Sequence, residues 1–163
     1  MNQKSTLGAV IAALIAGDDI LLIRQPDRHK PRWKLPGGEI EAGEDVIQAF
    51  AREITDETKF KIRIARDRLN KWIVDDDSIV IAHKSMRMWP NRDKVGEHPQ
   101  HFFVVEAKNP MDLLSRGNEL IREDDGETIE TRIFKLDAIR TMPDFLDCQW
   151  PLIEQVLALR QVA

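Results

Sequence analysis

The sequence predicts a single mixed α/β domain. Short apolar runs of strand length recur along the chain and outnumber the helical segments. One amphipathic helical segment lies between these runs at Asp45–Lys59, and a second, Gln149–Val162, follows the last of them. The 163 residues are 42% hydrophobic, which is enough for one core, and no linker or internal repeat divides residues 1–163.

The first predicted element is a β-hairpin over Thr6–Arg24. The apolar run Leu7–Ala16 is followed by turn residues at 17–19, and a second apolar run covers Ile20–Ile23. A secretory signal is the alternative, because Lys4 precedes the first run. That run is too short to span a bilayer, and cleavage would remove a strand, so the hairpin is favoured.

The next elements lead into and out of the first helix. A polar connector over Gln25–Arg32 precedes a short strand predicted at Trp33–Leu35. The helix at Asp45–Lys59 carries its apolar side chains on one stripe and begins with acids, which favour a helix N-terminus. Further strands are predicted at Lys61–Ala65, Lys71–Val74, Ser78–Ala82, Phe102–Ala107 and Thr128–Leu136.

Two polar segments interrupt this pattern. Met88–Gln100 and Asn109–Glu127 are charged and broken by Pro or Gly, so both are predicted as loops, with one helical turn at Met111–Leu114. Long loops in a compact domain are often functional.

The overall charge restricts the partners. A net charge of −4 argues against stable, non-specific binding to nucleic acid. The one cysteine, Cys148, excludes an internal disulfide, and a cytoplasmic location without membrane attachment is expected.

Three acids crowd one face of the first helix. Glu53, Asp56 and Glu57 are spaced i, i+3 and i+4, so their like charges repel unless a cation lies among them. Carboxylate oxygens suit Mg²⁺ or Mn²⁺, and the preceding glycines, Gly37 and Gly38, let backbone approach a ligand. The alternative is a solvated acidic helix face.

The stretch Gly38–Phe60 (GEIEAGEDVIQAFAREITDETKF) resembles the Nudix box. The matching positions are Gly38, Glu44, Arg52, Glu53, Ile54, Glu57 and Phe60. Asp56 replaces a glutamate of the pattern and Lys59 replaces a glycine. The resemblance implies a Nudix α/β/α sandwich around a mixed β-sheet. It also implies a MutT-like, Mg²⁺-dependent hydrolase that cleaves a phosphoanhydride bond in a nucleoside diphosphate linked to another moiety.

The resemblance assigns roles to the residues of the box. Metal ligands would be the Gly37 carbonyl, Glu53, Asp56 and Glu57, with Asp56 acting through water because its side chain is shorter. Glu53 and Glu57 would be catalytic through that metal.

The remaining residues of the box, Glu44, Arg52 and Lys59, would determine the geometry of the loop and of the helix end. Glu44 and Arg52 would form a bidentate pair that fixes the loop over the helix, although an ordinary surface ion pair is the alternative. Lys59 would occupy a left-handed helix end that suits glycine better.

A further acid beyond the box is expected. The candidates are Glu97, Glu127 and Glu130, and Glu127 is preferred as a catalytic residue because it lies just before the last predicted strand, as in MutT-like members. A surface-loop acid without a catalytic role is the alternative.

The substrate side is predicted from a basic cluster of Arg24, Arg28, His29, Lys30, Arg32 and Lys34. Such a cluster would attract a polyphosphate, or would be a solvated connector. Trp33 would pack under the loop or stack on a base, with Trp72 and Trp89 as other stacking platforms. The predicted substrate-side residues are Arg24, Trp33, Gly38, Glu44 and Arg52.

Two alternatives to a hydrolase stay open. Asp56 and Lys59 are compatible with a non-catalytic module that senses a nucleotide. An isoprenoid diphosphate isomerase of the same fold is disfavoured, because its cysteine would precede the metal helix. The expected substrate is a nucleoside triphosphate or nucleotide sugar, and a homodimer is possible by analogy alone.

Overall fold

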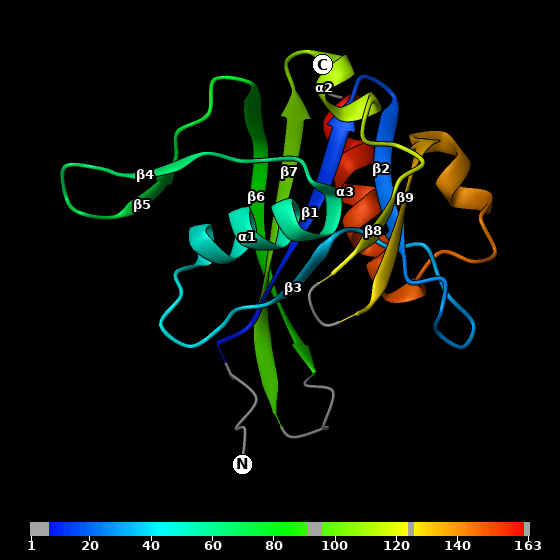
Figure 1. Cartoon of the computed structure of the whole chain (residues 1–163), viewed down its shortest axis with the longest axis horizontal. Coiled ribbons are helices and arrows are strands. Elements are labelled where there is room, and N and C mark those ends of the chain that lie inside the picture. Colours follow the sequence, from blue (N-terminus) through cyan, green and yellow to red (C-terminus); the bar gives the residue numbers. More distant parts are fainter. Residues whose placement is uncertain (1–6, 91–95, 124–125, 162–163) are drawn as a thin grey trace.

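The computed structural model describes residues 7–90, 96–123 and 126–161. Figure 1 shows a sheet with helices on both faces. The strands are β1 (Ala9–Ala16), β2 (Asp19–Arg24), β3 (Gly37–Glu39), β4 (Ile64–Arg66), β5 (Trp72–Val74), β6 (Ile79–Pro90), β7 (Glu97–Ala107), β8 (Leu120–Arg122) and β9 (Thr128–Lys135). The helices are α1 (Val46–Thr58), α2 (Pro110–Leu114) and α3 (Trp150–Gln161), with 3₁₀ turns η1 (Leu136–Thr141) and η2 (Asp147–Gln149).

The main sheet is mixed. Its strand order is β6-β7-β1-β2-β9-β8, and β3 pairs with the first half of β1. The β1–β7 pair is parallel, whereas the other neighbours are antiparallel. Every residue of β1 is buried, as expected for a strand that lies between helices.

A hydrophobic core lies on each face of this sheet. The core on the α1 face includes Val10, Phe50 and Phe103, and the two phenylalanine rings stack with centroids 4.4 Å apart. The core on the other face includes Phe102 and the apolar side of α3, such as Ile153. These layers confirm the predicted α/β/α sandwich around a mixed sheet.

The N-terminal hairpin is confirmed over its described residues, and Thr6 of the predicted range lies outside the described part. Ala16 pairs with Asp19 across a two-residue turn, and Gly17 there has a φ of +62°, which a glycine adopts without strain. The predicted helices at 45–59 and 149–162 are also present, although residues 162–163 lie outside the described part. Within the described residues no helix is both long and apolar enough to cross a membrane.

Several predicted boundaries are wrong. The strand at Trp33–Leu35 is reduced to isolated bridges, because Trp33 pairs only with Phe145 and Lys34 only with Ile23. The first strand after α1 is Ile64–Arg66 and not Lys61–Ala65.

The two predicted loops contain regular structure. β6 runs on to Pro90 and β7 begins at Glu97, so much of Met88–Gln100 is a β-ribbon, and residues 91–95 lie outside the described part. The prolines and charges suggested a loop. Pro99 is tolerated in β7 because the β1–β7 ladder ends at the pair Ala9–Gln100, so among the described residues Pro99 is paired on the β6 side and not on the β1 side. The other segment contains α2, which confirms the turn at Met111–Leu114, and β8.

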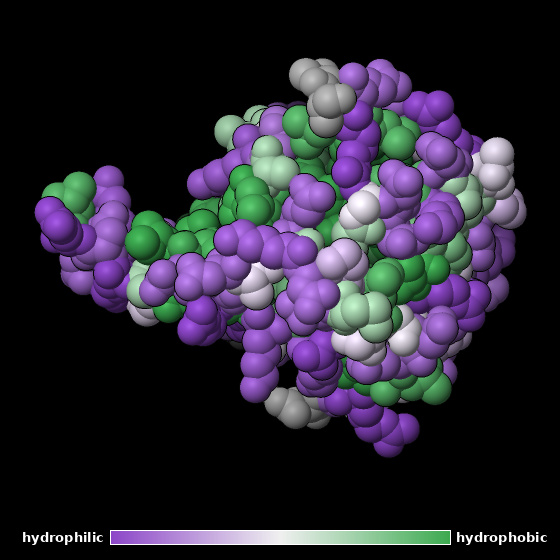
Figure 2. Space-filling model, turned by 90° about the horizontal axis from the view of Figure 1, so that it is seen from above, coloured by the Kyte–Doolittle hydropathy of each residue, from purple (hydrophilic) through white to green (hydrophobic). Residues whose placement is uncertain are grey.

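One hairpin stands away from the sandwich. β4 and β5 form a separate two-stranded sheet that leaves the body beyond α1 (Figure 1). Seen from above, it is a projecting lobe with hydrophobic atoms among hydrophilic ones (Figure 2).

Candidate active site

The first helix is held by caps at both ends. The Asp45 carboxylate accepts a hydrogen bond from the Ile47 N–H at 2.8 Å, and the Gln48 side chain accepts one from the Asp45 N–H at 3.0 Å. At the other end Lys59 has a φ of +60° and its N–H donates to the Thr55 carbonyl. The predicted left-handed lysine is therefore confirmed, and the capped helix holds Glu53, Asp56 and Glu57 in fixed positions.

Arg52 ties the loop before the helix to the helix itself. Its Nε and Nη2 atoms donate to the two carboxylate oxygens of Glu44 at 2.7 and 2.8 Å. Nη2 also donates to the Glu39 carbonyl at 3.0 Å, and Nη1 donates to Glu53 Oε1 at 2.7 Å. The Arg52 hydrogen bonds hold the pKa of Glu44 below its ordinary value. The predicted bidentate pair is present.

Glu57 lies at the centre of the site. It is 6% exposed, and its Oε1 accepts a hydrogen bond from the Gly37 N–H at 2.7 Å. Burial and the nearby Glu53 carboxylate raise the pKa of Glu57 to about 8. Burial is also the first cause that raises the pKa of Glu53. Burial therefore disfavours the charged form of both carboxylates, and Arg52 offsets part of this effect at Glu53.

The two glycines are required by close packing. A Cβ on Gly38 would lie 2.5 Å from Glu53 Oε1, so a side chain there would displace the carboxylate. A Cβ on Gly37 would overlap the Val10 carbonyl of β1. The Gly37 N–H is bonded to Glu57, and a metal-binding role for its carbonyl stays a prediction.

One acid near the β8–β9 turn that the sequence analysis did not name, Glu123, influences the box, and the role predicted for Glu127 stays a prediction. Glu123 and Glu127 face each other across the β8–β9 turn, where the Glu123 N–H donates to the Glu127 carbonyl at 2.8 Å. The Glu127 carboxylate accepts hydrogen bonds from Gln25 and Arg28 of the connector after β2. The charge of Glu123 raises the pKa of Glu57, after the larger effects of burial and Glu53.

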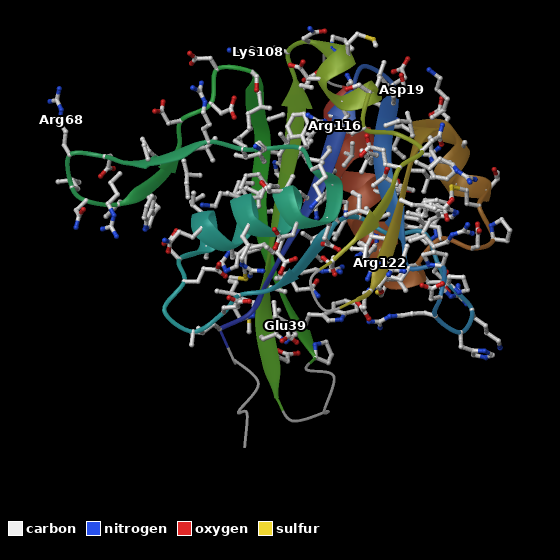
Figure 3. The ribbon with its side chains drawn as sticks, in the orientation of Figure 1. Asp19, Glu39, Arg68, Lys108, Arg116 and Arg122 are labelled. Atoms are coloured by element: carbon white, nitrogen blue, oxygen red, sulfur yellow. The ribbon has the colours of Figure 1, made fainter. Side chains whose placement is uncertain are left out.

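Strand alternation explains why Glu123 reaches the site. Ile121 of β8 is buried in the core on the α1 face, and Glu123 lies two residues further on the same face. β3, where Glu39 is labelled in Figure 3, contacts α1, and Ile121 of β8, the strand where Arg122 is labelled, belongs to the same core as the apolar side of α1. The sequence did not predict Glu123, because the alternation of Ile121 and Glu123 is informative only when β8 is recognised as a strand.

The other two candidate acids have different surroundings. Glu130 pairs with Arg24, with Nη2 to Oε2 at 2.7 Å, and with Arg132. Glu97 lies opposite Pro90 at the far end of the β6–β7 ribbon.

Much of the basic cluster is paired with acids. Arg24 contacts Glu130, Arg28 contacts Glu127, and Arg32 lies 4.0 Å from Asp147. Lys34 is different, because its charge lowers the pKa of Glu57. Lys34 is therefore a member of the predicted cluster whose charge reaches the box.

Trp33 is a packed residue in this structure. It is 2% exposed, its ring contacts Phe134 edge to face, and the guanidinium groups of Arg24 and Arg132 lie 4.5 and 5.0 Å from its centroid. Of the two sequence-based interpretations the packing role is present, whereas stacking on a base would require these groups to move.

A row of side chains extends the site across the sheet. Gly38 pairs with Val10, Val10 with His101, and His101 with Met86, so these positions share one row and one face. Burial, then the neighbouring Lys84, lowers the pKa of His101. The strand predicted at Ser78–Ala82 ends before Met86, and the one predicted at Phe102–Ala107 begins after His101, so this part of the row was not predicted.

A divalent cation fits the donor set, but the acids are not arranged around one. Among the described residues no three acidic, histidine or cysteine side chains converge as a ready metal site. Arg52 binds Glu53, and Asp56 is exposed. The raised pKa values of Glu53 and Glu57 are the feature that a cation would relieve, after their carboxylates turn toward it.

An α/β/α sandwich with an acidic helix clamped to a glycine loop defines a class, and the comparisons identify it. The chain belongs to the Nudix family, because the family model described as NUDIX domain matches residues 5–156. This match confirms the resemblance found in the box.

Individual relatives are more distant. A Bacillus subtilis (strain 168) protein, which carries the provisional name 8-oxo-dGTP diphosphatase, is 37% identical over 60 residues. That match spans 37% of this chain and 39% of the relative, so the chain matches about two-fifths of that relative's length.

Solved structures share the fold at low identity. A Caenorhabditis elegans Ap4A hydrolase in a binary complex has a TM-score of 0.62 at 15% identity and covers 96% of this chain and 99% of its own. The NUDIX domain of Shewanella oneidensis NrtR, complexed with ADP ribose, has a TM-score of 0.59 at 18% identity, with coverages of 98% and 90%. A NUDIX hydrolase from Nitrosomonas europaea has 0.58 at 19%, with coverages of 94% and 87%.

Proposed function

We propose that this chain is a divalent-metal-dependent hydrolase that cleaves a phosphoanhydride bond in a nucleoside diphosphate linked to another moiety. The observation that carries the proposal is the buried Glu57 carboxylate, which is bonded to Gly37 and lies in the field of Glu53 and Glu123. Burying acids together costs free energy unless a cation joins them. Family membership supports the same chemistry.

Glu53, Asp56, Glu57 and the Gly37 carbonyl would hold Mg²⁺ or Mn²⁺. Bound there, such an ion neutralises the phosphate oxygens and lowers the pKa of a coordinated water. Arg52 and Glu44 keep the glycine loop in place over the helix. Lys34, whose charge already reaches Glu57, would attract the phosphate chain.

Glu123 is the proposed late acid in preference to Glu127. Its carboxylate would accept a hydrogen bond, and then a proton, from the attacking water. Glu127, held by Gln25 and Arg28, would keep the β8–β9 turn against the connector.

A nucleoside triphosphate is the preferred substrate. The nucleoside would lie along the row from Gly38 to His101 and Met86, with Lys84 and His101 as polar contacts. The name of the B. subtilis relative favours an oxidised purine nucleotide within this class. A nucleotide sugar is the other member of the predicted class, and a cytoplasmic location stays a prediction.

Product analysis tests the proposal. The protein is incubated with nucleoside triphosphates, oxidised nucleotides and nucleotide sugars, with Mg²⁺ or Mn²⁺, and the products are separated by anion exchange. We expect turnover of at least one nucleotide that stops when metal is chelated and in the Glu57→Gln variant. Equal turnover by Glu57→Gln would contradict the proposal.

A non-catalytic nucleotide-sensing module is the second candidate, because Arg52 already binds Glu53 and no preassembled metal cluster exists among the described residues. Calorimetry separates the two functions. A sensor binds nucleotide tightly and forms no product even with Mn²⁺, whereas the proposed hydrolase forms product.

A further inference from the structure

The β4–β5 hairpin, here called the arm (residues 64–74), contacts α1 near its root and forms a sheet of its own. β4 pairs only with β5, and an isolated two-stranded sheet is marginally stable in water. Its root is covered, because Ile64 and Val74 pack against the core on the α1 face. At its tip, residues 68–71 are exposed.

The tip is nevertheless well ordered by local contacts. The Asp67 carboxylate accepts hydrogen bonds from the N–H groups of Leu69 at 2.8 Å and Lys71 at 2.9 Å. Asn70 completes the turn with a φ of +62°. A tip held in this way exposes side chains in a preorganised arrangement, which lowers the entropy cost of binding.

The arm exposes apolar side chains together with a cation stacked on an aromatic ring. Leu69 is 75% exposed and Ile73 is 41% exposed. The Arg66 guanidinium lies 4.6 Å from the centroid of the Trp72 ring. The hydrophobic atoms on the projecting lobe are visible in Figure 2. This combination is typical of a protein contact surface.

Charge is divided along the arm. The tip carries Arg66, Arg68 and Lys71, with Asp67 as its acid, and Figure 3 shows Arg68 at the end farthest from the body. The root is followed directly by Asp75, Asp76 and Asp77. Arg63 lies across from them, where its charge helps to lower the pKa of Asp76, but one cation against three acids leaves the root an excess of negative charge. Asp76 caps the backbone N–H groups of Ser78 and Arg63, while Asp75 and Asp77 are exposed.

We propose that the arm binds the arm of a second copy of this chain, with the two arms antiparallel about a two-fold axis. Each basic tip would then lie against the acidic root of the other copy, so the surface is self-complementary, as a two-fold contact requires. Lys71 and Asp75 are four residues apart, or about 13 Å along a strand. Two antiparallel arms that overlap by this length would place Lys71 of each copy opposite Asp75 of the other.

A polyanion such as nucleic acid is a weaker fit to the same surface. The three root carboxylates would repel a phosphate chain, and so would the net charge of −4. The arm contact is also small, below the roughly 1,200 Å² of a standard complex, so the dimer would be weak and sensitive to salt.

Sedimentation velocity on the full chain tests the proposal independently of any activity. From about 1 µM to about 500 µM protein, we expect conversion of monomer to dimer. Raising NaCl from about 50 mM to about 500 mM should reverse part of it, because screening shortens the reach of the charges.

Charge reversal identifies the surface. Arg68→Glu/Lys71→Glu makes tip and root both acidic, and Asp75→Lys/Asp77→Lys makes both basic, so each variant alone should remain monomeric. Mixed in equal amounts, the two variants should form a heterodimer, because each tip then meets a root of opposite charge. Lys108→Glu/Arg140→Glu changes the net charge as much as the first variant, away from the arm, and should dimerise like wild type.

Several outcomes would overturn the proposal. These are a wild-type protein that stays monomeric over the whole range, a dimer unchanged by either arm variant, or a mixture that stays monomeric. Circular dichroism confirms that the variants fold. Tight binding of a labelled single-stranded oligonucleotide, lost in Arg68→Glu/Lys71→Glu, would assign the arm to nucleic acid instead.

Discussion

The acids of α1 and those of the β8–β9 turn reach the site by different means. Glu53 and Glu57 lie one helical turn apart, so their closeness follows from helix geometry alone. Glu123 influences Glu57 from 66 residues away in the sequence, because β8 contributes to the core on the face of the sheet that α1 covers. Local spacing thus defines the metal helix, whereas tertiary packing selects the late acid.

The largest expected effect tests the helical half of this comparison. Glu57→Gln should lower kcat by about 10²–10⁴-fold, because it removes a charged group from the reacting centre. The metal-free fold should persist, because a neutral amide is easier to bury than a carboxylate. Steady-state kinetics measures kcat, and circular dichroism measures the fold. A variant with normal kcat would contradict the assignment of Glu57 on α1 to the reacting centre.

The next effect tests the half that depends on packing. Glu123→Gln should lower kcat by about 10²-fold, and Glu127→Gln by less than about 10-fold, since only the former loses a proton acceptor near Glu57. The matched pair is assayed under identical conditions. A larger loss of kcat in Glu127→Gln than in Glu123→Gln would favour Glu127 as the late catalytic acid, as the sequence predicted.

A smaller effect is expected at the brace between loop and helix. Arg52→Lys keeps the charge but cannot make the bidentate bond to Glu44, so kcat/KM should fall about 10–100-fold. Glu44→Gln should fall within the same range, and the double variant should lose little more than either single one. Additive losses would show that the two residues act separately.

The smallest effect concerns stability against pH in metal-free protein. The pKa of Glu57 is raised in the folded chain, so its stabilising contribution is complete below pH 4.5 and is lost as pH rises through about 8. With chelator present, the melting temperature of the wild-type protein should therefore fall more between pH 5 and pH 9 than that of Glu57→Gln. Equal losses would show that Glu57 keeps an ordinary pKa.

The sequence predicted the parts of the molecule that depend on short-range order. The hairpin at Thr6–Arg24, α1 and the Glu44–Arg52 pair all follow from periodicity or fixed spacing. The β6–β7 ribbon was missed because Pro90 and Pro99 are tolerated where a ladder ends, which sequence alone does not show. Glu123 was missed for a different reason, because the residue that it influences, Glu57, is distant from it in the sequence.

The most direct test of the central claim is a Mn²⁺ titration by calorimetry on wild type, Glu57→Gln and Asp137→Asn. Asp137 is exposed and belongs to η1, so its variant controls for the loss of any single acid. We predict that Glu57→Gln binds Mn²⁺ at least about 10-fold more weakly, while Asp137→Asn matches wild type. Equal affinity in wild type and Glu57→Gln would contradict the assignment of α1 as the metal helix.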